Sequence, residues 1–276
     1  MNIAEALQYG HIELNNADSS KIDSRVLLCY LLACPTSYLH AWPDKKLTDA
    51  QQVLWTTLIQ QRQKGQPVAY LTGQRGFWTL DLKVTEDTLI PRPDTELLVS
   101  LALDKLKPAM YVADLGTGSG AIALSLAAEQ PTAQIVAMDF SMAALLVAKE
   151  NARNHKFSNV SFWRGSWLAA IADKSFDMVV SNPPYIEAND IHLSQGDVRF
   201  EPLSALVSGV DGLNDIRLIV KQAQRCLKLG GWLMVEHGYA QAKQVRQVFS
   251  EAGFSKVSSQ QDFGGNDRVT IGLVAV

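Results

Sequence analysis

The sequence predicts an α/β fold in which a small helical bundle precedes a doubly wound, mostly parallel sheet of seven strands. The main observation is that short apolar runs alternate with segments of helical periodicity from Met110 onward. Residues 1 to about 73, in contrast, show helical periodicity alone. A glycine-rich turn also stands between the first apolar run and the helix after it, as in folds that bind nucleotides at the edge of the sheet.

The range 1–73 is predicted to form a helical domain. Ile3 and Ala6 begin an amphipathic pattern, and serine and aspartate residues are available to cap a more buried helix at 26–32. Thr48 is expected to cap a third helix, which ends in a basic turn before Gly65. The apolar positions of this third helix are Val53, Leu54, Leu58 and Ile59.

The range 74–90 is predicted to form a hairpin linker, because residues 77–84 alternate between apolar and polar side chains. The range 91–276 then forms the α/β domain. Its proline-rich beginning leads into a leucine-rich helix, for which Asp94 or Thr95 is the expected N-cap.

Seven strands and four helices are predicted in the remainder of the α/β domain. The strands are expected at 110–114, 134–138, 160–164, 177–181, 231–236, 256–260 and 267–275. The helices are expected at about 120–129, 141–154, 213–228 and 240–252. Because no helix separates the last two strands, one of them is expected to run antiparallel to the others. The long loop from 186 to about 212 is expected to frame a functional site.

The composition is that of a soluble globular protein. Hydrophobic residues make up 47% of the chain, and a net charge of −3 provides no global positive field for nucleic acid. The three cysteines are too few for a disulfide framework and favour a reducing compartment. We see no signal peptide and no apolar run long enough to cross a membrane, so we expect a cytoplasmic protein without a membrane partner.

The glycine-rich turn at 116–120 follows a predicted strand and precedes a predicted helix. Glycine allows the backbone to adopt positive φ and to approach a ligand closely. The next strand ends at Asp139, at the spacing of a carboxylate that accepts hydrogen bonds from ribose hydroxyls. Taken alone, this arrangement fits either a dinucleotide or a methyl donor that carries a nucleoside.

The fourth predicted strand ends at Asn182-Pro183-Pro184-Tyr185, at the sheet edge where open α/β folds bind ligands. The prolines lack N–H groups and hold the chain extended, which leaves their carbonyls free. The Asn182 amide oxygen and these carbonyls can accept both hydrogens of a substrate NH2 group, while Tyr185 packs on its planar face. A plain turn is the alternative interpretation. A hydride-transfer enzyme or a module without catalysis has no need of this acceptor clamp, so the stretch favours the methyl donor.

Together, these two motifs resemble the class I S-adenosylmethionine-dependent methyltransferases of the Asn/Asp-Pro-Pro-Tyr subgroup, which methylate planar NH2 nitrogens in adenine, cytosine and glutamine. The stretches LIPRPDTE at 89–96 and VRFEPLSAL at 198–206, with the helical N-terminal domain, narrow the resemblance to the release factor glutamine methyltransferases of the PrmC/HemK type. The resemblance covers nearly the whole chain and is weakest before residue 65. It implies a Rossmann-like class I methyltransferase fold and S-adenosylmethionine as the cofactor.

The resemblance also implies roles for individual residues. The expected cofactor-binding residues are Gly116, Thr117, Gly118, Ser119, Gly120, Asp139, Trp167 and Asn182, with Asp139 on the ribose and Trp167 beside the adenine. The expected substrate-binding residues are Asn182, Pro183, Pro184 and Tyr185. Asn182, Pro183 and Tyr185 are also expected to be catalytic, and no metal is expected. Ser166 departs from the family, whose members usually carry aspartate there, so an acidic acceptor for the adenine amino group is missing.

The implied activity is methyl transfer from S-adenosylmethionine to the N5 amide nitrogen of the glutamine in the Gly-Gly-Gln motif of class I peptide chain release factors. The helical domain is expected to recognise the release factor, since the clamp covers too few atoms to select a protein. The alternative is an amino-methyltransferase for adenine or cytosine in nucleic acid, which the acidic net charge disfavours. We expect a monomer and no nucleic acid partner. His192, Glu201 and His237 are candidates for accepting the released proton, although a structural role for each is the simpler interpretation.

Overall fold

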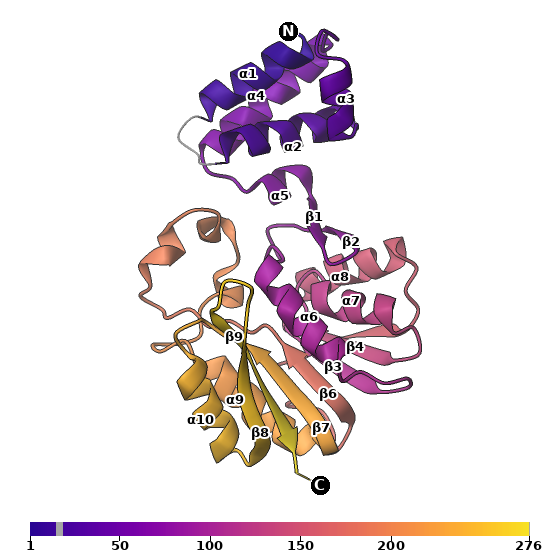
Figure 1. Cartoon of the computed structure of the whole chain (residues 1–276), viewed down its shortest axis with the longest axis vertical. Coiled ribbons are helices and arrows are strands. Elements are labelled where there is room, and N and C mark those ends of the chain that lie inside the picture. Colours follow the sequence, from indigo (N-terminus) through magenta and orange to yellow (C-terminus); the bar gives the residue numbers. More distant parts are fainter. Residues whose placement is uncertain (15–18, 276) are drawn as a thin grey trace. The chain divides into compact units, whose positions relative to one another are not determined.

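The computed structural model describes residues 1–14 and 19–275, and the chain divides into two compact units (Figure 1). The first, here called the helical unit, contains Met1–Gln74 together with Ser194–Phe200. The second, the sheet unit, contains Arg75–Leu193 and Glu201–Val276. No helix in the described residues is both long and apolar enough to span a membrane.

The helical unit is built around the buried side chains of Trp55 and Ile59. Its helices are α1 (Ile3–Glu13), α2 (Ser20–Leu32), α3 (Thr36–Ala41), α4 (Asp49–Gln63) and α5 (Val68–Thr72). Thr48 caps α4 as predicted: its hydroxyl accepts a hydrogen bond from the Gln51 N–H, and the Gln51 side chain accepts one from the Thr48 N–H. The short helices α3 and α5 were not predicted, because so few residues carry too little periodicity.

Two details of the predicted helices are wrong. Ser19 precedes α2, but its hydroxyl donates to Asp23 at 2.9 Å and does not cap the helix. Val53 and Leu54 are exposed, whereas Trp55 supplies the buried face of α4 with Ile59. The apolar residues of α4 lie on adjacent faces of the helix, so their spacing alone does not identify the buried face.

The segment 194–200 belongs to the helical unit through charged side chains. The guanidinium of Arg62, near the end of α4, pairs with Asp23 at 2.7 Å and with Asp197 at 3.0 Å. Arg199 donates to the main-chain carbonyl of Lys64 at 2.9 Å. A segment that is remote in sequence therefore completes the helical unit.

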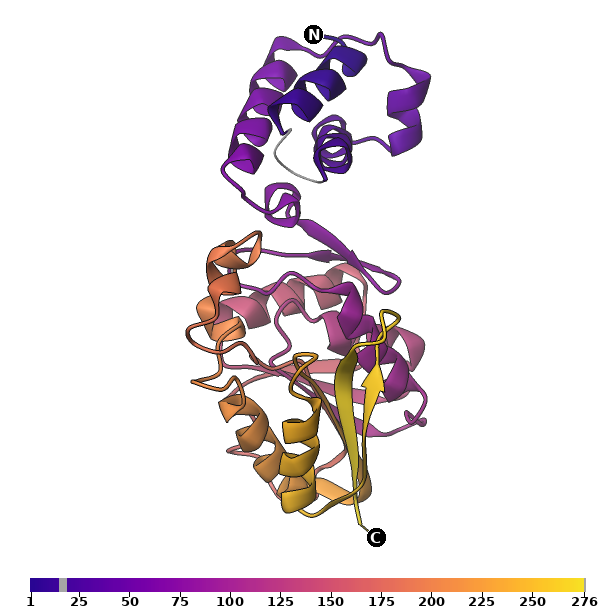
Figure 2. The ribbon, with the colours of Figure 1, turned by 60° about the vertical axis from the view of Figure 1, so that its left-hand side comes forward.

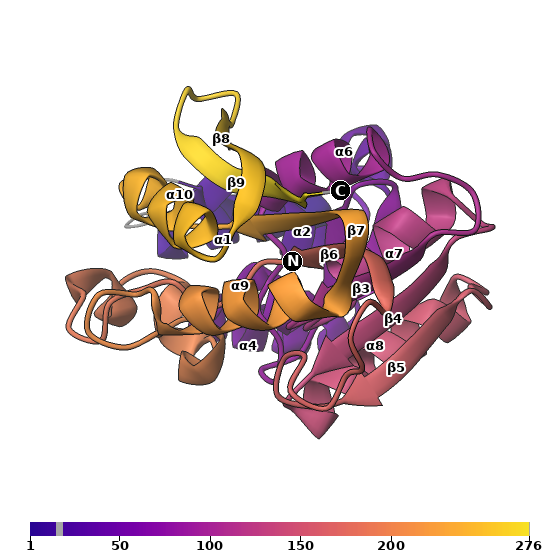
Figure 3. The same ribbon diagram turned by 90° about the horizontal axis from the view of Figure 1, so that it is seen from below.

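The sheet unit contains the expected seven-stranded sheet, in the order β5-β4-β3-β6-β7-β9-β8 (Figure 3). Its strands are β3 (Tyr111–Leu115), β4 (Gln134–Asp139), β5 (Val160–Arg164), β6 (Phe176–Ser181), β7 (Leu227–Glu236), β8 (Phe254–Gln261) and β9 (Asp267–Val274). All pairings are parallel except those of β9, which runs antiparallel to both β7 and β8 and confirms the predicted reversal (Figure 2).

Helices cover both faces of the sheet (Figures 1 and 3). One buried cluster joins α6 (Glu96–Leu103) and α7 (Ala121–Glu129) to the sheet, together with the end of α8 (Met142–Asn154) and the hairpin of β1 (Gln74–Phe77) and β2 (Leu80–Lys83). A second cluster packs α9 (Asn214–Cys226) and α10 (Ala242–Glu251) against the opposite face. α9 ends earlier than predicted, because β7 begins at Leu227, which pairs with Phe176 before a bulge.

The register of the parallel strands brings three segments to one edge of the sheet. Leu115 in β3 pairs with Met138 in β4 and with Ser181 in β6. The residues that follow these three are Gly116, Asp139 and Asn182, so all three lie at the carboxyl edge of the sheet, where open α/β folds bind ligands.

We predict that Gly10→Ala destabilises the helical unit. A Cβ at this position in α1 would lie 2.8 Å from both Ser24 Oγ and a ring carbon of Trp55, which is closer than real contacts allow. The gain in helix propensity, about 1 kcal/mol, is then outweighed by overpacking that costs about 1–3 kcal/mol. Hydrogen exchange of amides in α1, α2 and α4 measures the loss. Gln8→Ala, at an exposed position of the same helix, is the control and should leave exchange unchanged; equal protection in both variants would contradict the packing argument.

Candidate active site

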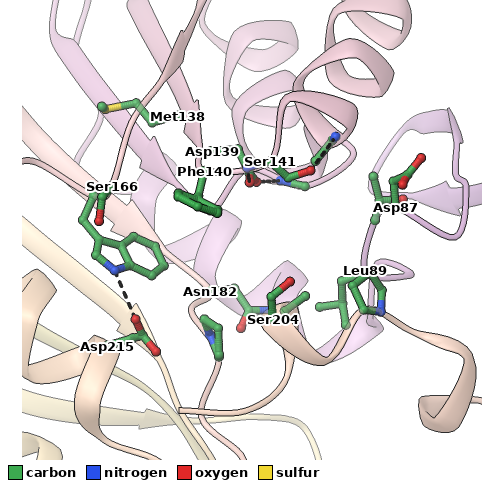
Figure 4. Close-up of a pocket in the computed structure, with 18 of the residues that line it drawn as sticks. Asp87, Leu89, Met138, Asp139, Phe140, Ser141, Ser166, Asn182, Ser204 and Asp215 are labelled. Atoms are coloured by element: carbon green, nitrogen blue, oxygen red, sulfur yellow. Dashed lines mark hydrogen bonds between the residues drawn. The ribbon is translucent and has the colours of Figure 1, made fainter. Parts of the chain in front are cut away.

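A cavity of about 470 Å³ opens at the carboxyl edge of the sheet (Figure 4). Its walls come from the residues after β3, β4, β5 and β6, from segment 86–89, and from the loop that precedes α9. Pro202, Ser204 and Ala205 belong to this loop and line the cavity, as expected for the 186–212 region. The loop is fixed beside the end of β6, because the Tyr185 and Ile186 N–H groups both donate to the Leu206 carbonyl.

The glycine-rich turn contributes its backbone to the cavity wall. Gly116 and Gly118 line the cavity with φ of +70° and +55°, a conformation that side-chain-bearing residues rarely adopt. A Cβ on Gly116 would lie 3.3 Å from the ring of Trp167, so the ring would have to shift by a few tenths of an ångström to admit a side chain.

The other members of the turn lie behind the cavity wall. Thr117 is buried, and its hydroxyl donates to Asp114 at 2.6 Å. Ser119 is also buried, and a Cβ on Gly120 would meet the side chain of Leu124. Thr117, Ser119 and Gly120 therefore shape the turn, while Gly116 and Gly118 are the members that face the cavity. Burial raises the pKa of Asp114 to about 7, against the hydrogen bonds from Thr117 and from the Ala123 N–H.

Asp139 lies at the end of β4 with its carboxylate anchored to the backbone. One oxygen accepts a hydrogen bond from the Gly118 N–H at 2.9 Å, and the other accepts one from the Ser141 N–H at 2.8 Å. Burial raises the pKa of this carboxyl group, while the backbone donors oppose that rise. Each carboxylate oxygen has further acceptor capacity, so Asp139 can still receive hydroxyl groups from a ligand in the cavity.

Two aromatic side chains border the same part of the cavity. Phe140 follows Asp139, and this residue is 73% exposed because its ring projects at the cavity rather than into the core (Figure 4). Trp167 adopts a φ of +50°, and its indole N–H donates to Asp215 at 3.1 Å. Ser166, the position at which the family resemblance led us to expect aspartate, also lines the cavity.

Asp215, in the first turn of α9, was not identified from the sequence. One of its oxygens accepts from the Trp167 indole, and the other accepts from the Ser208 hydroxyl at 2.6 Å. It belongs to none of the motifs described above. An acidic residue is common in the first turn of a helix, so the sequence gives no reason to assign Asp215 a functional role. The structure identifies it as the support of an aromatic wall.

Asn182 projects at the cavity with a defined orientation of its amide. Its Nδ2 donates to the hydroxyl of Thr95 at 3.1 Å, and its Oδ1 accepts no hydrogen bond from the described residues. Pro184 also lines the cavity, whereas Pro183 and Tyr185 are not among the lining residues. Burial and the nearby Glu236 carboxylate raise the pKa of the Tyr185 hydroxyl.

The bond to Asn182 also corrects the predicted cap of α6. Neither Asp94 nor Thr95 provides a capping side chain: α6 follows the 3-10 turn Pro93–Thr95, and its N-cap residue Thr95 makes no side-chain cap. Asp94 instead pairs with Arg268 at 2.9 Å. Thr95 thus contacts the end of β6 and Asp94 contacts β9, and local sequence reveals neither contact.

The three proton-acceptor candidates have structural partners. His192 is exposed and pairs with Asp190. Glu201 is buried in an ion pair with Arg92 and also accepts from the Ile90 N–H. His237 is buried between the Gly238 carbonyl and the Thr270 hydroxyl, and burial lowers its pKa. These contacts agree with the structural interpretation of all three residues.

Comparison with known proteins gives consistent matches. A family model described as "Methyltransferase domain" matches residues 106–268, and one described as "PrmC N-terminal domain" matches residues 5–73. The "Release factor glutamine methyltransferase" of Aliivibrio fischeri is 48% identical over 95% of this chain and 93% of its own length. The protein of the same name from Vibrio cholerae is 49% identical over 95% of this chain and 92% of its own length. Among solved structures, a methyltransferase from Pyrococcus furiosus covers 83% of this chain and 100% of its own with a TM-score of 0.56 at 15% identity, which shows the shared fold.

We predict that Asp215→Ala releases the Trp167 indole. The lost hydrogen bond has a charged acceptor, worth roughly 1.5–3 kcal/mol, and it holds a residue with unfavourable positive φ. Trp167 fluorescence, taken as the difference from a Trp167→Phe background, should shift towards that of a solvated indole. Asp215→Asn keeps an oxygen acceptor and is the matched control. An unchanged difference spectrum in Asp215→Ala would show that the wall does not depend on this contact.

Proposed function

The chain belongs to the release factor glutamine methyltransferase family, and from this premise we propose that it transfers a methyl group from S-adenosylmethionine to the N5 amide nitrogen of the glutamine in the Gly-Gly-Gln motif of class I peptide chain release factors. The curated relatives match this chain over nearly their whole length, so both the methyltransferase domain and the N-terminal domain are represented. Within the cavity, Asn182 supports the acceptor part of the proposal, and Asp139 with its neighbours supports the cofactor part.

The observation that carries the proposal is the orientation of Asn182. Its NH2 group is used by Thr95, so Oδ1 is the atom of the amide left to accept a hydrogen bond from a ligand. An acceptor at this edge suits a substrate that donates hydrogens, such as the side-chain NH2 of glutamine. A substrate without an NH2 group leaves the acceptor unpaired, and sites of this kind can discriminate by about 10⁴–10⁵-fold.

The residues around Asp139 fit the nucleoside part of S-adenosylmethionine. The Asp139 carboxylate would accept from the ribose hydroxyls, and Phe140 and Trp167 provide aromatic surfaces for the adenine. Gly116 and Gly118 allow the backbone to approach the methionine part. Thr117, Ser119 and Gly120 would act by shaping this turn. When bound, S-adenosylmethionine supplies a methyl group on a positively charged sulfur.

The clamp residues would act by positioning the nitrogen. An amide nitrogen is a weak nucleophile because its lone pair is delocalised into the carbonyl. Acceptance of its two hydrogens by Asn182 Oδ1 and the Pro183 carbonyl would aim the lone pair at the methyl carbon, with Tyr185 supporting the planar group. Positioning contributes up to about 7–11 kcal/mol in ideal cases. The same acceptors would stabilise the positive charge that develops on nitrogen before its proton is lost to solvent.

Recognition of the release factor would rest on the helical domain. The clamp contacts a few atoms, whereas a specific protein complex buries about 800 Å² on each partner. The N-terminal match to the "PrmC N-terminal domain" over residues 5–73 supports a protein substrate. Adenine also offers a planar NH2 group to the clamp, so nucleic acid remains the competing substrate in the test below.

We predict that Asp139→Ala weakens S-adenosylmethionine binding in calorimetry. Loss of hydrogen bonds to a charged acceptor corresponds to roughly 1.5–3 kcal/mol. Because the pKa of Asp139 is raised, wild-type affinity should fall as the pH is lowered towards that pKa and the carboxylate becomes protonated. Asp139→Asn keeps the shape of the side chain and should show weak binding with a flat pH profile. Unchanged affinity in both variants would refute the ribose assignment.

We predict methylation of an intact class I release factor and of no other partner in a direct comparison. Purified release factor, its Gln→Glu variant in the Gly-Gly-Gln motif, and DNA are each incubated with labelled methyl donor, and the modified residue is mapped by mass spectrometry. Asn182→Ala should lower turnover by about 10²-fold or more while cofactor binding is largely retained. Labelling of DNA, or equal labelling of the Glu variant, would overturn the proposed substrate.

A further inference from the structure

Glu236 is a buried carboxylate beside the clamp that the proposed reaction does not use. It ends β7, and its neighbour Val235 pairs with Ser181, so Glu236 stands next to Asn182 at the edge of the sheet. Its side chain is 1% exposed, and its Oε2 accepts no hydrogen bond from the described residues. A buried carboxylate that lacks a full set of donors is costly, so its presence calls for a functional reason.

Two hydroxyl groups and two charged groups face this carboxylate. The hydroxyls are those of Thr95, from the turn before α6, and Tyr185, from the end of the clamp. The charged groups are Arg268 on β9 and Asp94, which pair with each other at 2.9 Å. Arg268 also pairs with Asp262 at 3.0 Å. Glu236 therefore depends on the hydroxyls for its hydrogen bonds.

Thr95 connects Glu236 to Asn182. Its oxygen accepts from Asn182 Nδ2 at 3.1 Å, so its own hydrogen points away from Asn182. A carboxylate can only accept, and Glu236 is the acceptor on that side. The hydrogen bonds thus form a chain with one direction: the Asn182 N–H donates to the Thr95 oxygen, and the Thr95 hydroxyl donates to Glu236. The opposite direction would turn the NH2 group of Asn182 towards the cavity, where it would repel the hydrogens of a substrate amide.

We propose that Thr95 and Glu236 are positioning residues that fix the direction of this hydrogen-bond chain and thereby present Asn182 Oδ1, and not Nδ2, to the substrate NH2 group. The inference rests on the proposed function for its catalytic consequence, but the hydrogen bond from Asn182 to Thr95 is present in the free protein. The same carboxylate faces the Tyr185 hydroxyl, so one buried group supports both sides of the clamp.

The ionisation of Glu236 should be visible in the free protein. Burial raises its pKa to about 7, with Thr95, Tyr185 and Arg268 acting in the opposite direction and Asp94 adding to the rise. Below that pH the carboxyl group gains a hydrogen that it can donate, and the direction of the chain is no longer fixed. Catalysis should therefore decline as the pH falls through about 7.

Substitutions that reverse the direction of the hydrogen-bond chain test the proposal. In Asn182→Asp, the introduced carboxylate has no hydrogen for Thr95, and the single Thr95 hydrogen cannot serve this carboxylate and Glu236 together. In the double variant Asn182→Asp with Glu236→Gln, the introduced amide can donate to the Thr95 oxygen, and the Thr95 hydroxyl can then donate to the introduced carboxylate. An oxygen of the introduced carboxylate can face the cavity in both variants, but only in the double variant do Thr95 and its two neighbours again match in donors and acceptors.

We expect turnover on release factor to fall about 100-fold in Asn182→Asp and about tenfold in Glu236→Gln, and to recover at least about tenfold in the double variant relative to Asn182→Asp. Losses that simply multiply would overturn the proposal.

Thr95→Val and Thr95→Ser separate positioning from folding. Valine keeps the volume and removes the hydroxyl, so the unfolding midpoint should fall as buried polar groups lose a partner. Turnover should fall in protein that is still folded, as shown by an affinity for S-adenosylmethionine equal to that of the wild type. Serine restores the hydroxyl and should restore turnover. Equal activity of the valine and serine variants would contradict the proposal.

A readout without substrate distinguishes this inference from the proposed function. The Asn182 side-chain NH2 resonances, assigned by their absence in Asn182→Asp, should shift with a midpoint near pH 7. The shift should disappear in Glu236→Gln and in Thr95→Val. A shift with these properties supports the hydrogen-bond chain even if no release factor is methylated. Absence of release factor methylation would refute the proposed function alone. Asn182 NH2 resonances that do not change with pH in the wild type would refute the proposed hydrogen-bond chain.

Discussion

The parallel register of β3, β4 and β6 is the constraint on which the site depends. Because Leu115 is level with both Met138 and Ser181, the glycine turn, Asp139 and Asn182 leave the sheet together. A slip of one residue in β4 would turn Asp139 to the other face of the sheet and remove it from the Gly118 N–H. Trp167 packs close to the same turn, since a Cβ at position 116 would lie 3.3 Å from its ring.

Three carboxyl groups with raised pKa lie along this carboxyl edge. Asp114, Asp139 and Glu236 are all raised chiefly by burial, and each is supported by a different set of donors. Asp139 uses backbone N–H groups, Asp114 uses one hydroxyl and one N–H, and Glu236 depends on hydroxyls alone. Burial favours the neutral form of each group, so the edge becomes negative only as the pH rises above these raised pKa values. Such an edge suits a sulfonium ligand and a nitrogen that becomes positively charged during methyl transfer.

The sequence predicts those features whose signal is local or periodic. The alternation of apolar runs locates all seven strands within a few residues, and the turn at 116–120 and Asn182 stand directly at strand ends. Contacts between side chains that are distant in the sequence cannot be predicted from such local patterns. Thr95 looks like a helix cap, yet it binds Asn182, and Asp215 looks like an ordinary helix start, yet it holds Trp167. In α4, periodicity identifies a helix but not that Trp55, rather than Val53, faces the core.

The segment 194–200 has a consequence for the modularity of the chain. The boundary near residue 74 suggests two modules in series, yet part of the first module is encoded inside the second. Removal of the N-terminal residues would take away Arg62 and the Lys64 carbonyl, which are the partners of Asp197 and Arg199. Segment 194–200, which would lose these partners, comes in the sequence just before Pro202 and Ser204, and these two residues line the cavity. The two modules are therefore not interchangeable parts, and a swapped N-terminal module would have to bring partners for this segment with it.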